Sequence, residues 1–393
     1  MSRIYMDNAA TTTVAADVLE QMIPYFTQVG GNPSSIHGNG REAKKALEIA
    51  RRQVAQILGA LPQEIYFTSG GSESDNWAIK GAAFEMKEKG KTHIITSQIE
   101  HHAVLHTCEW LEKQGFTVTY VPVDEYGVVK VDEIEKAITD ETALITIMAA
   151  NNEIGTIQPV KEIGEIAKAR KVLFHTDAVQ AVGAMPINVN DWNVDMLSLS
   201  AHKFRGPKGV GVLYVRKGVR LNNLVHGGAQ ERGKRAGTEN LPGIVGLATA
   251  LKRAYDHLDE VVAKETYLRD KLINGILEAI PYTRLNGHRT QRLPNNVNVS
   301  VQYIEGEALL LRLDLAGVAA SSGSACTSGS LDPSHVLLAI GLPHEIAHGS
   351  LRLTLSDEST EEEVDEVLHV LPNIVNTLRN MSPLYEMILK EGK

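Results

Sequence analysis

A lysine that directly follows a short apolar run has the surroundings of a nucleophilic amine. Lys203 ends the segment Ser200-Ala201-His202-Lys203, after the apolar run 196–199 and before a turn rich in glycine and proline. Burial and neighbouring cations lower the pKa of a lysine amine, and the neutral amine forms Schiff bases with carbonyl groups. The pattern therefore favours Lys203 as the attachment point of a carbonyl cofactor.

Three other polar segments also follow apolar runs, and with Lys203 they match the needs of pyridoxal phosphate. This cofactor requires a lysine, an acid at its ring nitrogen, a loop for its phosphate and a group against its ring face. Asp177, the small-residue loop with Gly71 and Ser72, and His101 supply the last three in that order. Taken singly, Asp177 is more often a helix cap and His101 a structural histidine, while the loop suits a phosphate site and a simple helix N-cap about equally. The prediction rests on their combination.

A cysteine among small residues is the second chemical feature of the chain. Cys326 lies in residues 319–330, of which ten of twelve are alanine, serine or glycine. Few bulky side chains are available to anchor such a segment, which predicts a mobile loop. The alternative is a flexible tether with an incidental thiol. The other cysteine, Cys108, lies in an amphipathic helical pattern, where a buried and unreactive thiol is expected.

Composition excludes several classes of protein. With 393 residues, 43% hydrophobic and 22% charged, the chain suits two domains or one large α/β core with an appendage. Its 39 basic and 48 acidic residues give a net charge of −9, which argues against binding to nucleic acid or an anionic membrane. Two cysteines exclude a disulfide framework. No apolar run is long enough to span a membrane and the start lacks an apolar leader, so a cytoplasmic location is expected.

Seven β-rich runs alternate with helical patterns between about residues 41 and 260. Several are almost continuously apolar, as strands buried on both faces of a sheet are. The runs are 65–68, 93–96, 117–121, 143–148, 172–175, 196–199 and 210–215, and the first long helix is expected over 41–58 with Gly59 as its cap. A mainly parallel sheet between two helical layers follows, with ligands beyond the carboxyl ends of its strands.

The pattern changes after residue 260. A helix at about 262–280, a strand at 296–301, a helix at 305–316, a strand at 351–355 and a final helix from about 361 indicate a smaller α+β domain. We therefore predict a large domain over residues 13–260. The small domain would comprise residues 1–12 with 261–393 and carry the cysteine loop at about 320–332.

Six ordered blocks resemble the NifS/IscS-type cysteine desulfurases, which are class V aminotransferases. The blocks span nearly the whole chain and are Asp7–Thr12, Gly31–Ser35, Ala150–Thr156, His175–Gln180, Ser200–Lys203 and Arg235–Asn240. Residues 322–327 resemble the long cysteine loop of the group I members. One departure is Asn8-Ala9, where many relatives carry another pair. The resemblance implies the α/β architecture of fold type I, with pyridoxal 5'-phosphate as the cofactor.

The resemblance also implies a role for individual residues. Lys203 would bind the cofactor covalently, Asp177 would pair with the ring nitrogen, Gln180 would bind the phenolic oxygen and His101 would stack on the ring. The implied phosphate ligands are Gly71, Ser72, Ser200, His202 and, from a second subunit, Thr238. The implied substrate ligands are Arg352, Asn8 and Asn151, and Asn151 would also contact the cofactor. Without the resemblance, Arg352 would be interpreted as a surface cation at a strand edge.

The activity that the resemblance implies is conversion of L-cysteine to L-alanine, with Lys203, His101 and Cys326 as the catalytic residues. The sulfur would pass to a persulfide on Cys326 and then, from a homodimer, to an iron–sulfur scaffold protein of the NifU/IscU kind. No structural metal site is implied, and transient iron–sulfur ligation by Cys326 stays open. The alternatives are a selenocysteine lyase, another class V aminotransferase, or a non-catalytic scaffold. A nitrogenase-dedicated role and a housekeeping role are not distinguished.

Overall fold

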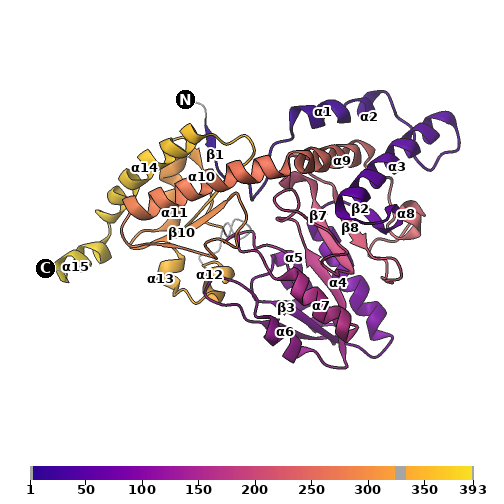
Figure 1. Ribbon diagram of the computed structural model, residues 1–393, viewed down its shortest axis with the longest axis horizontal. Coiled ribbons are helices and arrows are strands. Elements are labelled where there is room, and N and C mark those ends of the chain that lie inside the picture. Colours follow the sequence, from indigo (N-terminus) through magenta and orange to yellow (C-terminus); the bar gives the residue numbers. More distant parts are fainter. Residues whose placement is uncertain (1–2, 324–332, 392–393) are drawn as a thin grey trace.

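A seven-stranded sheet forms the centre of residues 3–323 and 333–391, which are the residues that the computed structural model describes (Figure 1). The strand order is β2-β8-β7-β6-β5-β3-β4, and within this sheet only β8 runs antiparallel to its neighbours. The strands are β2 (Ile65–Thr68), β3 (His93–Ser97), β4 (Thr117–Val121), β5 (Thr142–Thr146), β6 (Leu173–Asp177), β7 (Met196–Ser200) and β8 (Gly211–Val215). The predicted mainly parallel sheet is confirmed.

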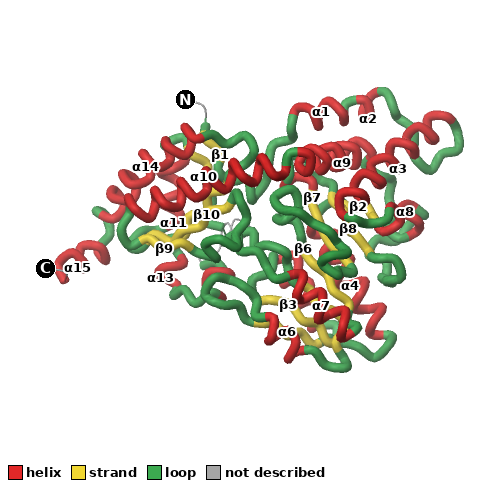
Figure 2. Tube along the Cα trace, viewed as in Figure 1, coloured by secondary structure: helices red, strands yellow, loops and turns green. Residues whose placement is uncertain are grey.

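Helices cover both faces of this sheet (Figure 2). Successive strand residues point to opposite faces, so Ile94 packs in one apolar cluster with Trp77 while Ile95 packs in another with Leu247. The first face carries α4 (Gly71–Lys87) and α5 (His102–Glu112), and the second carries α3 (Gly38–Leu58), α6 (Val131–Ala137), α7 (Val160–Arg170) and α9 (Leu241–Asp256). Cys108 in α5 is fully buried, as expected, and burial raises the pKa of its thiol.

A second, antiparallel sheet has the order β12-β10-β9 and its own apolar cluster. Its strands are β9 (Thr283–Leu285), β10 (Asn296–Val301) and β12 (Ser350–Thr354), and its helices are α10 (Leu258–Ala279), α11 (Gly306–Leu315) and α14 (Glu361–Arg379). The strand β1 (Ile4–Tyr5) pairs with β11 (Val318–Ala319) beside them. Met6 belongs to this cluster, but Val336 and Leu337 pack with the first sheet. The division at residues 12 and 260 therefore stays a prediction.

Short helices complete the described chain: α1 (Ala16–Met22), α2 (Pro24–Thr27), α8 (Gln230–Gly233), α12 (His335–Ala339), α13 (His344–Ala347) and α15 (Pro383–Glu391), with single turns η1 (Pro62–Glu64) and η2 (Ala201–Lys203). Helix α3 begins three residues earlier than predicted because the His37 side chain accepts a hydrogen bond from Gly40 N (3.3 Å). It ends as predicted at Gly59, where φ is 71°. In the described ranges, no helix is long and apolar enough to cross a membrane.

A buried ion pair fixes the strained segment that follows the sheet. Arg51 of α3 donates two hydrogen bonds to the Glu231 carboxylate (2.8 and 2.7 Å), and Phe67 N donates a third (3.0 Å). Both partners are almost fully buried, and Glu231 and Arg232 adopt left-handed φ angles of 45° and 59°. Since such angles are unfavourable for these residues, the ion pair must hold the segment in place.

Removing one partner of this pair is expected to destabilise the protein strongly. Arg51→Ala leaves the Glu231 carboxylate buried without a cation, which typically costs about 3–5 kcal/mol. Chemical denaturation would measure the change in unfolding free energy. Lys136→Ala is the control, because Lys136 pairs with Asp132 at an exposed site and such pairs contribute about 0–1 kcal/mol. Equal effects of the two substitutions would contradict the account.

Candidate active site

The carboxyl ends of the parallel strands meet at a cavity of about 380 Å³. Asp177 ends β6, Ser200 ends β7, and the segments that follow β3 and β5 bring His101 and Asn152 to the same place. Nine of the predicted site residues line this cavity: Gly71, Ser72, His101, Asp177, Gln180, Ser200, His202, Lys203 and Arg352. The expected position beyond the strand ends is thus where these residues converge.

Asp177 places a carboxylate at the base of the cavity. It is 6% exposed, and Val179 N donates a hydrogen bond to its Oδ1 (2.9 Å). Burial raises the pKa of Asp177 to about 6, against the opposing effects of that hydrogen bond and of Lys203. Near neutral pH the carboxylate is therefore mostly ionised and can bind a cationic ring N–H.

Lys203 follows β7 and is held by the N-terminal segment of the chain. Its Nζ donates to the carbonyl oxygens of Ala9 and Ala10, the latter at 2.9 Å. Gln180 Nε2 donates to the same Ala9 carbonyl (3.0 Å). The backbone around Lys203 is pinned as well, because Thr12 N donates to His202 O (3.0 Å). Residues 9–12 therefore set the position of the amine.

His101 is the N-cap of α5 and is neutral at physiological pH. Ala103 N donates to its Nδ1 (3.1 Å), so the ring proton lies on Nε2. Burial lowers the pKa of His101 to about 4, with further contributions from Lys203 and nearby histidines. A neutral imidazole with this tautomer donates a hydrogen bond from Nε2 and is a poor base.

The other end of the cavity opens to the N-terminus of α4. Gly71, Ser72, Ser200 and His202 also line the adjoining cleft, together with Lys208. A Cβ on Gly71 would lie 2.7 Å from Val179 Cγ2, so only glycine allows this close approach. Glu73 in the first turn is neutralised by Arg235, which donates two hydrogen bonds to it (2.8 and 3.0 Å). Free backbone N–H groups at a helix N-terminus and a nearby lysine favour an anion.

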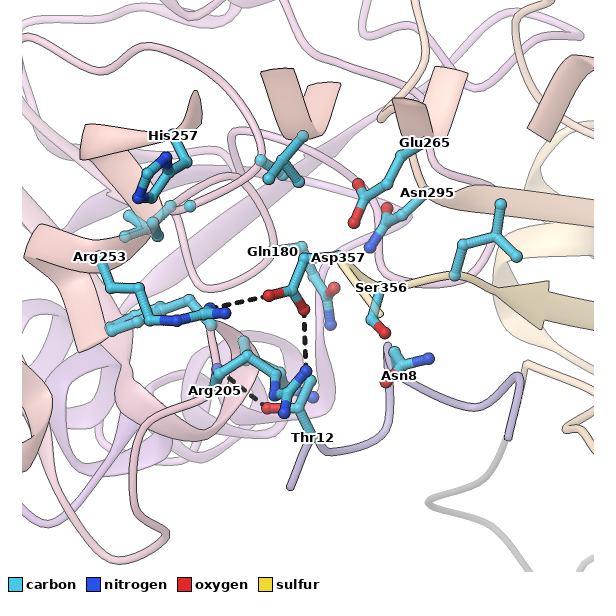
Figure 3. Close-up of a pocket in the computed structure, with 18 of the residues that line it drawn as sticks. Asn8, Thr12, Gln180, Arg205, Arg253, His257, Glu265, Asn295, Ser356 and Asp357 are labelled. Carbon is cyan, nitrogen blue, oxygen red and sulfur yellow. Dashed lines mark hydrogen bonds and ion pairs between the residues drawn. The ribbon is translucent and has the colours of Figure 1, made fainter. Parts of the chain in front are cut away.

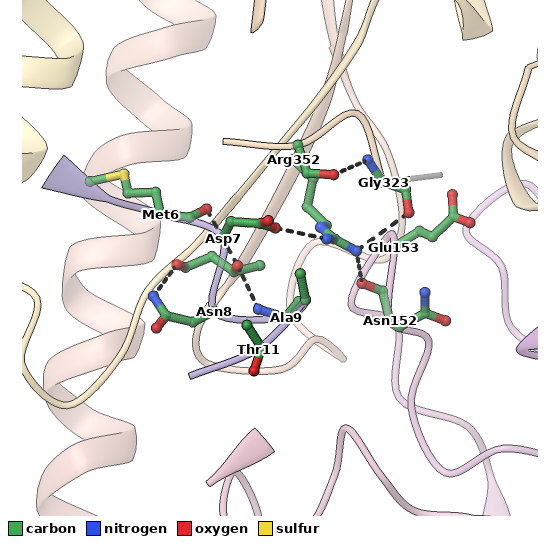
Figure 4. A network of polar contacts seen from close by, with 12 residues as sticks. Met6, Asp7, Asn8, Ala9, Thr11, Asn152, Glu153, Gly323 and Arg352 are labelled. Atoms are coloured by element: carbon green, nitrogen blue, oxygen red, sulfur yellow. Dashed lines mark hydrogen bonds and ion pairs between the residues drawn. The ribbon is translucent and has the colours of Figure 1, made fainter. Parts of the chain in front are cut away.

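Arg352 lies on the opposite wall and is only 2% exposed (Figure 4). Its guanidinium donates to Asp7 Oδ1 (2.9 Å), to Asn152 O (3.0 Å) and to Gly323 O (3.4 Å). Its Nε is buried and has no hydrogen-bond partner in the described part of the chain. The interpretation as a surface cation is therefore wrong, because β12 turns this side chain inward.

Three predicted site residues do not line this cavity. Asn151 is buried and its amide binds the backbone, with Nδ2 donating to Ile99 O (2.8 Å) and Oδ1 accepting from Glu153 N (2.9 Å); its neighbour Asn152 lines the cavity instead. Asn8 and Thr238 line two other cavities. Cys326 lies outside the described residues. Within them, no group of three histidine, cysteine, aspartate or glutamate side chains is arranged to hold a metal ion.

Asp75 is a cavity residue that the sequence analysis missed. It lies one turn into α4, is 1% exposed, and its Oδ1 has no hydrogen-bond partner within the described ranges. Burial, followed by the charges of Asp177 and Glu100, raises the pKa of Asp75 well above its usual value. His175 Nε2 lies 3.6 Å away but stays neutral, because burial lowers its pKa to about 3. Asp75 lies four residues after Gly71, on the helix face toward the strands. This spacing was the signal in the sequence that could have identified it as a cavity residue.

Comparison with known proteins gives consistent matches over nearly the whole chain. The family model "Aminotransferase class-V" matches residues 4–367. A curated protein named "Cysteine desulfurase IscS" from Methanosarcina thermophila is 63% identical over 97% of this chain and 94% of its own length. A solved structure titled "NIFS-LIKE PROTEIN" has a TM-score of 0.90 at 46% identity, covering 96% of this chain and all of its own. Another, titled "SspA in complex with cysteine", has a TM-score of 0.81 at 42% identity, covering 91% of this chain and all of its own.

The buried Asp75 should make the stability of the cofactor-free protein depend on pH. A buried acid with a raised pKa retains a proton that the unfolded chain has already lost, so stability falls as pH rises. Between about pH 5 and pH 8, Asp75→Asn should therefore lose less unfolding free energy than the parent protein. Asp132→Asn, at an exposed acid whose pKa is lowered, is the control and should match the parent. Parallel curves for Asp75→Asn and the parent would contradict the assignment.

Proposed function

Because the chain belongs to the aminotransferase class-V family and to the cysteine desulfurases within it, we propose that it converts L-cysteine to L-alanine and supplies the sulfur for iron–sulfur cluster assembly. The observation that carries this proposal is the convergence of Lys203, Asp177, His101 and Arg352 on one buried cavity. An amine, an ionised acid and a carboxylate-binding guanidinium are the groups that pyridoxal phosphate chemistry on an amino acid requires.

The cavity residues fit pyridoxal 5'-phosphate. The acid for the ring nitrogen is Asp177, and the neutral ring of His101 lines the same cavity as the Lys203 amine. One N–H of the Gln180 amide binds Ala9 O. Its second N–H and its amide oxygen are left for hydrogen bonding at the phenolic oxygen of the cofactor. Position 71 has no space for a Cβ, so it requires glycine. Without a side chain there, the backbone N–H groups at the α4 N-terminus stay open to a phosphate. Gly71, Ser72, Ser200 and His202 would hold that phosphate.

When bound, this cofactor withdraws electrons from the bonds at the α carbon of an amino acid. Asp177 would keep the ring nitrogen protonated, because its carboxylate is ionised near neutral pH. The Lys203 amine would take the proton from the substrate's α carbon and return a proton later. In the structure this amine donates to the carbonyl oxygens of Ala9 and Ala10, which would position it for both steps.

Arg352 would bind the substrate carboxylate through its guanidinium. In the structure that guanidinium is paired with Asp7, so a substrate must share it or displace the acid. For the catalytic role proposed for His101, its neutral ring with a proton on Nε2 supports hydrogen-bond donation to the substrate. Asn152 is the asparagine placed to contact a ligand in the cavity. The substrate roles of Asn8 and Asn151 remain predictions.

The sulfur would leave the substrate through Cys326. Its thiolate attacks the substrate sulfur, a sulfur–sulfur bond forms and the carbon–sulfur bond breaks. The electron pair stays with the substrate carbon, which takes up a proton, and L-alanine leaves. The second product is a persulfide on Cys326, so no external oxidant or reductant is needed.

We further propose a cytoplasmic homodimer that passes this sulfur to a scaffold protein of the NifU/IscU kind. The support is the similarity to relatives named IscS and a NifS-like structure. Thr238 lies outside the main cavity, at a neighbouring one with Ser69 and Arg235. A contribution of Thr238 to the phosphate site of a second subunit is consistent with that position. Transient binding of an iron–sulfur cluster by Cys326 stays part of the proposal.

Persulfide formation on Cys326 can be tested by mass spectrometry. After incubation with L-cysteine, the peptide that contains Cys326 should gain the mass of one sulfur atom. Cys326→Ser should lose alanine production by about 100-fold or more, since the attacking thiolate is absent. Its visible cofactor absorption band should remain, because the residues that line the cavity are unchanged.

The matched control is Cys108→Ala, because Cys108 is the second thiol and is fully buried in α5. This variant should form the persulfide and turn over like the parent protein. Normal turnover by Cys326→Ser, or loss of the persulfide only in Cys108→Ala, would overturn the proposed route of the sulfur.

A further inference from the structure

A second cavity, of about 350 Å³, is lined by residues that include Asn8, Gln180, Glu265 and Asp357 (Figure 3). It shares Lys203 and Gln180 with the active-site cavity but is otherwise lined by different residues. Its walls come from the N-terminal segment, the end of α9, the first turns of α10 and the chain that follows β12. Of the residues with a proposed role in the reaction, Asn8, Gln180 and Lys203 also line this space, whereas Glu265 has none.

Glu265 of α10 presents an unpaired carboxyl group to this cavity (Figure 3). The residue is 6% exposed, and no hydrogen bond or ion pair of its side chain is found in residues 3–323 and 333–391. A buried carboxylate without a partner is energetically costly. Burial, and then the charge of Asp357, raises the pKa of Glu265 to about 8, while Lys264 acts in the opposite direction. Glu265 therefore lacks the cation that would normally accompany it.

The cations already near the cavity are committed to other acids. Arg205 donates to Asp357 (2.8 Å) and Glu358 (2.6 Å), and Arg253 donates to the second Asp357 oxygen (2.8 Å). Lys203 is held by the carbonyl groups of Ala9 and Ala10. In the described ranges, both arginines at this cavity are thus already paired with acids, whereas Glu265 has no ion-pair partner.

Neighbouring groups also favour a ligand that donates hydrogen bonds. Asn8 Nδ2 donates to Thr354 O (2.8 Å) and Tyr5 O (3.3 Å), which leaves its amide oxygen to accept. Gln180 likewise uses an N–H on Ala9 O (3.0 Å). Ser356 and Asn295 lie beside Glu265 and Asn8 on the same side of the cavity (Figure 3). Several oxygen atoms thus surround the space in front of the carboxyl group.

Part of the wall is apolar and includes Val182, Ala184, Phe204, Val261 and Leu355, while Thr12, His257 and Glu260 line the cavity as well. We propose that this cavity is a binding site for a small primary amine, whose ammonium group pairs with Glu265 and whose carbon chain lies on the apolar wall. The ammonium group supplies three N–H donors for the carboxylate and the amide oxygens. A short carbon chain gains from leaving water on the apolar side.

Thermal unfolding of the cofactor-loaded, full-length protein tests this site, with n-propylammonium chloride as the probe. At about ten times its Kd, the amine should raise Tm by about 1–2 °C. The effect should be larger at about pH 9 than at about pH 6.5, because Glu265 must lose its proton to pair with the ammonium. Tetramethylammonium and potassium chlorides at equal ionic strength should give smaller shifts, since neither donates N–H bonds.

Glu265→Gln should raise the half-saturating concentration of n-propylammonium by about tenfold or more, as expected when a buried charged partner is lost. Glu278→Gln, the same change at an exposed position of α10, should respond like the parent. The proposal is overturned if Glu265→Gln binds the amine as the parent does, or if potassium stabilises the parent equally. If Glu265→Gln does not fold, absence of the amine-dependent and pH-dependent shift in the parent overturns it.

Discussion

The candidate active site depends on holding an acid and an amine together in a space with little water. Asp177 ends β6 and Lys203 follows β7, and these two strands are neighbours with Asp177 paired in register to Ser198. The parallel arrangement brings both residues to one edge of the sheet, where Asp177 is buried and Lys203 is half-buried. Opposite charges interact more strongly in such surroundings than in water. The neutral states of His101 and His175 follow from the same burial, which lowers the pKa of each imidazole.

The N-terminal segment connects this pair to the rest of the site. Its carbonyl groups at Ala9 and Ala10 hold the lysine, and Asp7 holds Arg352 on the opposite wall. Met6 packs in the core of the second sheet, while Ala15 packs against the first. One short stretch of chain therefore links the residue proposed to carry the cofactor to the residue proposed to bind the substrate. A shift of this segment would change both sites together.

Much of the fold could be predicted because buried parallel strands have almost continuous apolar sequences, and Lys203 and Asp177 follow two of them directly. Contacts between distant segments could not be predicted in this way. Glu231 pairs with Arg51 across the chain, and the burial of Asp75 depends on how α4 packs against the strands, for which its spacing from Gly71 was the only local sign. Asn151 was the asparagine predicted for the site, but its amide binds the backbone in the local turn, and its neighbour Asn152 lines the cavity. The mobile loop around Cys326 was predicted from composition alone. Cys326 itself lies outside the described residues.

The most direct test of the central claim is to find which lysine carries the cofactor. Borohydride reduction of the loaded protein makes the bond between pyridoxal phosphate and its lysine permanent, and peptide mass spectrometry then locates the modified residue. The account predicts the reduced cofactor on Lys203, the lysine that lines the same cavity as Asp177 and His101. Modification of Lys208, which lines the adjoining cleft, or the absence of any modified lysine, would contradict it.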